Sequence, residues 1–192
     1  SESAFCDCPS LQNIYYYGSE EDFNKVTIYN DEGWNGDLYA VINGEDGRRV
    51  YYRPWTYGTY TYVDENGNTA TIDGTKVPCR MLTDGITELT GGWYIADGTI
   101  NYGGTRLQVT RDSNIILKNG CELTTWGGIG VGNEIKLNIY SESLDKDKMG
   151  KMTVTGAPEN CPGIGSGMNT DSTVLIAGGN VTANGGYDAA GI

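Results

Sequence analysis

The chain has 192 residues, of which 29 are glycine and 14 are tyrosine, and it contains no histidine. Its formal net charge of −12 opposes binding to nucleic acid or to an anionic membrane surface, because both of these partners are negatively charged. Without histidine, this chain cannot form a Ser-His-Asp or Cys-His catalytic arrangement or a histidine-ligated metal site.

The first forty-odd residues combine a regular apolar spacing with the start of an acidic helix. Apolar side chains recur every three residues at Phe5, Cys8, Leu11 and Ile14, a spacing suited to a tight repeat arc that leads into a short strand. The run SEED at 19–22 predicts a short helix, with the serine as N-cap and carboxylates in the first turn.

The order of these motifs, SLQNIYYYG followed by SEEDFNKVTI, resembles the closing repeat of the BspA-type leucine-rich repeats of bacterial surface proteins. The resemblance covers about residues 1–43. It implies the terminal unit of a leucine-rich array, in which the four apolar residues are core positions and the acidic helix caps the stack. It also implies a secreted protein at the bacterial cell surface.

Residues 44–89 are expected to form a β-rich connector. Polar and aromatic side chains alternate from residue 50 onward, and the alternation is broken at Asn66-Gly67. Asn-Gly between two strand-like runs is the strongest short signal for a β-hairpin, so we predict a hairpin with its turn at this pair.

The connector also contains the aromatic tract YYRPWTYGTYTY at 51–62. Alternation along a strand directs one set of rings outward, and flat exposed rings can hold sugars, whereas packing on the sheet is the alternative. The candidate ligand-binding residues are therefore Tyr52, Trp55, Tyr57 and Tyr60.

Residues 90–192 consist of short apolar runs separated by Gly, Asn and Asp. Their spacing suggests an all-β sandwich, a barrel or a β-solenoid. TVTGAPENCPGI at 153–164 and NVTANGGYDAAGI at 180–192 repeat one rhythm of strand, glycine turn and Gly-Ile, which favours a right-handed parallel β-helix. Its inward positions would include Leu107, Val109, Ile115, Leu117, Ile129, Val131, Leu137, Ile139, Met152, Val154, Val174, Ile176 and Val181.

Stretches such as GGWYIADGTI, NIILKNGCELTT and GGNVTANGGYDAAGI resemble the glycine-rich β-helix segments of large surface proteins from gut Firmicutes. This resemblance covers residues 60–192 and implies little about mechanism. Because the chain opens and stops inside motifs, we expect it to be a piece of a longer protein. The unpaired edge of its last coil is expected to allow self-association.

Four features that could carry chemistry have structural interpretations. Asn169-Thr170-Asp171 is similar to a motif of polygalacturonases, but that family's other motifs are absent, and a loop-to-strand junction explains Asp171. The glycines of GGIGVG at 127–132 and GIGSG at 163–167 precede strands rather than helices, which favours coil corners over phosphate loops. Residues 145–148 form a solvated mixed-charge turn, and the five scattered cysteines are small buried hydrophobes.

The fold expected from the sequence is mainly β, with a leucine-rich terminal unit that has one short helix, a hairpin connector and a right-handed parallel β-helix (β-solenoid). The expected function is a non-enzymatic cell-surface scaffold or adhesin that contacts host or matrix glycans or proteins and uses no cofactor or metal. The alternatives are a carbohydrate-active β-helix enzyme, acting as a polysaccharide hydrolase or lyase, and a purely structural spacer.

Overall fold

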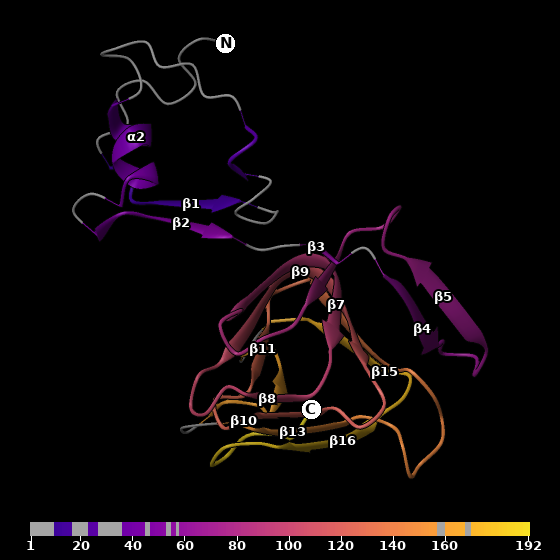
Figure 1. The fold of residues 1–192 in the computed structure, drawn as a ribbon. Coiled ribbons are helices and arrows are strands. Elements are labelled where there is room, and N and C mark those ends of the chain that lie inside the picture. The colour runs from indigo at the N-terminus through magenta and orange to yellow at the C-terminus, as the bar shows by residue number, and fades with distance from the viewer. Residues whose placement is uncertain are drawn as a thin grey trace. The chain divides into compact units, whose positions relative to one another are not determined.

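The computed structural model describes residues 10–16, 23–26, 36–44, 47–52, 55–56, 58–156, 160–167 and 170–192. The chain is mainly β with parallel sheets, as the sequence predicted (Figure 1). It divides into two compact units, Ser1–Trp55 and Thr56–Ile192. Among the described residues, no helix has the length and hydropathy needed to span a bilayer.

The first unit contains a two-stranded sheet and one described helix. Strand β1 (Asn13–Tyr16) pairs in parallel with β2 (Arg49–Tyr52), so a strand from the predicted connector joins the predicted terminal repeat. Helix α2 (Gly36–Ile42) buries Leu38 and Val41, which are three residues apart and therefore lie on one helix face. The sequence did not predict this helix.

Several predictions for the first unit concern residues that the structure does not describe. The acidic helix start at 19–22 and the core positions Phe5 and Cys8 lie outside the described residues. The other two predicted core positions, Leu11 and Ile14, are partly buried. The predicted leucine-rich repeat therefore stays a prediction.

The predicted hairpin is confirmed. Strands β4 (Thr59–Val63) and β5 (Thr69–Asp73) pair antiparallel on either side of the Asn-Gly turn, where Gly67 has a φ of 81°. The Asp64 carboxylate closes the turn, because its Oδ1 accepts hydrogen bonds from the backbone N–H groups of Asn66 at 2.9 Å and Asn68 at 2.8 Å.

This turn gives a prediction about pH. The backbone hydrogen bond from Asn68 is the main cause that lowers the pKa of Asp64 below its ordinary value of 3.8. A lowered pKa means that these hydrogen bonds stabilise the hairpin above pH 3.8 and weaken as the pH falls through the folded-state pKa. In an NMR pH titration, the Asn68 amide should therefore report a midpoint below 3.8. Asp64→Asn should abolish the transition, and a wild-type midpoint above 3.8 would contradict the assignment.

The second unit is built mainly from two sheets. The larger contains β3 (Trp55–Thr56), β6 (Cys79–Met81), β7 (Glu88–Ala96), β9 (Leu107–Leu117), β11 (Ile129–Val131), β12 (Lys136–Ser141), β14 (Ile164–Gly165) and β15 (Thr173–Ile176). The smaller contains β8 (Thr99–Asn101), β10 (Glu122–Thr125), β13 (Lys151–Thr155) and β16 (Asn180–Asn184), which lie side by side in Figure 1. The described pairings among β6 to β16 are all parallel.

From β7 onward the chain passes repeatedly from the larger sheet to the smaller one and back. Glu122 of β10 pairs with Lys151 of β13, and Lys151 pairs with Asn180 of β16, so each of these steps covers 29 residues. The inward side chains of both sheets form one main core, which includes Leu107, Leu123, Ile129, Leu137, Ile139, Met152 and Val154.

Most of the predicted inward residues belong to this core. Val174 and Val181, on the outer strands β15 and β16, are only partly buried against it. Ile176 differs from the prediction: it pairs with the fully buried Ile139, yet it is 37% exposed. The physical reason is that β15 pairs with β12 on one side only, so no described strand covers Ile176 from the other side.

Strand β9 pairs with different strands along its two halves. Its first half, residues 107–109, pairs with β11, and its second half, residues 113–117, pairs with β12. The neighbouring β7 has an irregular register between Leu89 and Thr90, followed by Gly91 at a φ of 101°. Such a β-bulge bends a strand, and the bend separates the two halves of the sheet.

Candidate functional site

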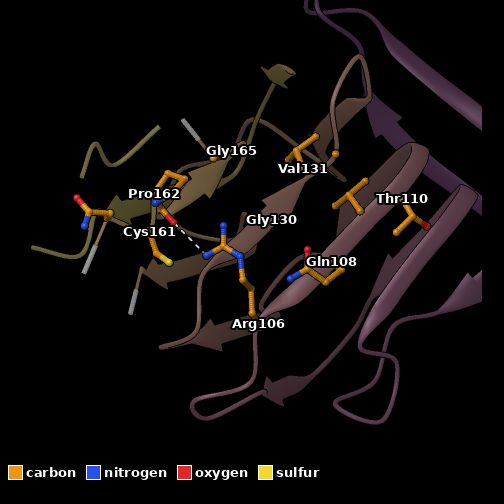
Figure 2. A pocket seen from close by; sticks show the side chains of 12 residues that line it. Arg106, Gln108, Thr110, Gly130, Val131, Cys161, Pro162 and Gly165 are labelled. Carbon is orange, nitrogen blue, oxygen red and sulfur yellow. Dashed lines mark hydrogen bonds between the residues drawn. The ribbon is translucent and has the colours of Figure 1, made fainter. Parts of the chain in front are cut away.

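A pocket of about 320 Å³ lies on the outer face of the first half of β9. Leu107 and Val109 point into the main core, so the alternating positions 106, 108 and 110 face outward. Figure 2 shows the pocket from close by. It is lined by Arg106, Gln108, Val109, Thr110, Gly130, Val131, Gly132, Asn160, Cys161, Pro162, Gly165 and Gly167.

The floor of the pocket is a row of residues in register across parallel strands. Gln108 of β9 pairs with Gly130 of β11, and Gly130 pairs with Gly165 of β14. A Cβ atom on Gly130 would lie 2.5 Å from Gln108 Oε1 and 2.8 Å from Arg106 Nε. The missing side chain of Gly130 therefore provides the space that the ends of Gln108 and Arg106 occupy.

Arg106 is held in place by two backbone carbonyls from other coils of the chain. Its Nη1 donates to the carbonyl of Gly127 at 3.0 Å and to that of Pro162 at 3.4 Å, the bond drawn in Figure 2. A Cβ on Gly128, which has a φ of 78°, would lie 2.6 Å from Nη1. Glycines thus let the guanidinium lie close to the backbone at this corner.

A carboxylate stands at the other side of the row. Glu88 of β7 pairs with Gln108, and its Oε1 accepts a hydrogen bond from Thr110 Oγ1 at 2.9 Å. None of the residues that line the pocket is itself a carboxylate. The site therefore offers one cation and several neutral hydrogen-bonding groups, an arrangement suited to binding a polar ligand.

Of the four predicted ligand-binding residues, Tyr60 alone has a described side chain. It lies on β4 and is partly buried against a second apolar cluster, whose buried members are Ile72, Cys79, Ile95, Ile116 and Tyr140. Tyr52 and Trp55 lie on β2 and β3, but their side chains are outside the described part of the chain, as is the whole of Tyr57.

The hairpin packs on the second half of the larger sheet through aromatic contacts. The Tyr62 ring lies 5.1 Å from Trp93 and 4.9 Å from Tyr140, measured between ring centroids, and Trp93 and Tyr140 stack at 5.5 Å. Aromatic side chains of this part of the tract thus serve packing, which was the alternative left open for them.

The cysteines divide into three groups. Cys79 and Cys121 are buried free thiols, and burial raises the pKa of both, that of Cys121 to about 11, so neither is poised as a thiolate. Cys161 is only partly buried and lines the pocket, unlike the prediction that it is a buried hydrophobe. Cys6 and Cys8 lie outside the described residues.

The other candidate features act through their backbone in the described part of the chain. Asp171 has an exposed side chain, while its N–H donates to Asn133 Oδ1 and its carbonyl accepts from Glu134, just before β15 begins. Lys148 and Asp145 form an exposed ion pair at 3.0 Å. No group of three or more potential metal ligands occurs among the described residues.

Sequence reasoning missed the pocket residues, although one signal for them exists. In RLQVT, residues 106–110, polar residues alternate with the two core residues, which identifies three outward polar side chains on a buried strand. Fold and site together define a mainly β protein with a polar pocket on a parallel sheet. No family model, curated protein or solved structure matches the chain.

Proposed function

We propose that the chain is part of a non-enzymatic scaffold of a bacterial cell surface that binds host or matrix glycans. The observation that carries this proposal is the pocket between Arg106, Gln108 and Pro162, which combines a fixed cation with amide and hydroxyl groups on a rigid sheet. Glycans are bound through many hydrogen bonds of this kind. The secreted location rests on the resemblance of residues 1–43 to BspA-type repeats.

The proposed architecture is a right-handed parallel β-solenoid. Its support is the repeated passage between the two parallel sheets and the two successive steps of 29 residues from β10 to β16. Solenoids offer long, regular surfaces on which in-register residues of several coils form one binding row. The row Gln108, Gly130 and Gly165 is of this type.

Self-association is proposed as a second contact, with another copy of the chain as the partner. Strands β15 and β16 are the outer strands of their sheets, and their core-facing Val174 and Val181 are partly exposed. An added parallel strand would satisfy the free backbone groups and cover these side chains.

The test is binding of the purified chain to a broad glycan and mucin array, with depolymerisation of the same polysaccharides followed in parallel. We expect binding without turnover, weakened at least about tenfold by Gly130→Ala, because the new Cβ displaces the ends of Arg106 and Gln108 from the pocket. These ends are flexible, so the variant should still fold.

Each other outcome selects an alternative. Turnover would favour the polysaccharide hydrolase or lyase, and no binding at all would favour the spacer. Binding that survives Gly130→Ala but is lost in Trp55→Ala or Tyr57→Ala would move the site to the aromatic tract.

A further inference from the structure

The guanidinium of Arg106 has one edge without a partner among the described residues. Its Nη1 carries two hydrogens, and the carbonyls of Gly127 and Pro162 accept both. The hydrogens of Nε and Nη2 remain, and Nε lies over Gly130 on the pocket floor. These two nitrogens form a planar edge with parallel N–H groups.

That edge matches one chemical group closely. Two parallel N–H groups of an arginine bind the two oxygens of a carboxylate in a planar, bidentate pair. Resting on the proposed function, we propose that the pocket binds a saccharide that carries a carboxylate, with the carboxylate on the Nε and Nη2 edge of Arg106.

The charges around the pocket fix the orientation of such a sugar. The guanidinium reaches toward Pro162, on the β14 side of the row, while Glu88 stands on β7 at the opposite side. A carboxylate is attracted at the first position and repelled at the second. The sugar hydroxyls then face Gln108 and Glu88, whose side-chain oxygens accept hydrogen bonds from them.

The overall charge makes the role of Arg106 testable. A chain with a net charge of −12 repels an anion in general, so binding depends on this local cation. A saccharide also fits the floor better than a side chain with a carboxylate at its tip, because Gly130 and Gly165 leave a flat surface in register with Gln108.

The experiment compares glucuronate with glucose, and galacturonate with galactose, in ¹H–¹⁵N NMR titrations of the full chain. The sugars of each pair differ at the carboxylate. We expect glucuronate or galacturonate to shift the Gln108, Gly130 and Gly165 amides and to bind at least about tenfold more tightly than its neutral partner, as charged hydrogen bonds require.

Three variants test the assignment. Arg106→Gln and Gly130→Ala should each lower the affinity for the acidic sugar at least about tenfold, and Arg106→Lys should not restore it, because an ammonium lacks the planar edge. Arg111→Gln is the matched control: it makes the same change in charge at an exposed position on the same strand, outside the pocket, and should leave the affinity unchanged.

Several results would overturn the inference. Equal binding of the neutral sugars, unaffected by Arg106→Gln, would exclude the carboxylate while leaving the proposed glycan function intact. Tighter binding of glucose 6-sulfate would assign the edge to a sulfate, and equal binding of N-acetylglutamate would exclude the saccharide class. Absence of binding here and on the glycan array would reject both proposals together.

Discussion

Replacing Gly127 by alanine is expected to destabilise the second unit by about 3 kcal/mol or more, among the largest effects of any single methyl group in this chain. Gly127 is buried at a corner between β10 and β11, where two coils meet backbone to backbone. An added Cβ would lie 2.5 Å from three backbone atoms: the nitrogen of Arg106, the oxygen of Gly104 and the carbonyl carbon of Thr105. Backbone atoms cannot rotate away, so the coils must separate.

The matched control is Gly104→Ala, on the opposite side of the same contact. A Cβ on Gly104 meets no atom within 4 Å, and this glycine is not among those with a positive φ. The control should change stability by less than about 1 kcal/mol. Urea unfolding followed by NMR cross-peaks of the second unit measures both variants separately from the first unit. Equal stability of the two variants would show that the corners are not in contact as described.

The fold of the second unit is readable from the sequence because two local signals agree with the tertiary structure. Leu107 and Val109 alternate with polar residues, and the structure buries both in the main core. Asn66-Gly67 predicts a turn through local backbone preferences alone, and the hairpin forms there. Such signals depend on neighbouring residues only.

Helix α2 escaped prediction because its sequence, GDLYAVI, is short and rich in residues that favour strands. Its helical form rests on burying Leu38 and Val41 together, which is a property of its tertiary surroundings. Propensity is a weak guide for a seven-residue segment when packing decides.

The pocket escaped prediction for a different reason. Its floor joins residues 108, 130 and 165, so the chain takes 22 residues to reach the second and 35 to reach the third. The unequal steps reflect loops of different length between the strands, and no fixed period predicts them. The apparent echo of Val154 by Val181 was misleading for this reason, because Val181 pairs with Met152 and Val154 with Ala183.

The second large effect is expected at Ile139, which is fully buried in the main core on β12. Ile139→Ala removes buried methyl groups and leaves a cavity between β9 and β15, which should cost about 3–5 kcal/mol. Ile176 is the matched position, since it is the in-register partner of Ile139 on the outer strand β15 and is 37% exposed. Ile176→Ala should cost about 1 kcal/mol or less, because much of its surface already contacts water.

The comparison of these two variants also tests the proposed contact between copies of the chain. At low protein concentration, urea unfolding should separate Ile139→Ala from Ile176→Ala by at least about 2 kcal/mol. If a second copy adds a strand beside β15, the cost of Ile176→Ala rises with protein concentration, because association stabilises the folded chain by mass action. Sedimentation velocity at the same concentrations should then show a dimer that the variant weakens. A small cost that does not change with concentration, together with a single monomeric species, would reject self-association at this edge.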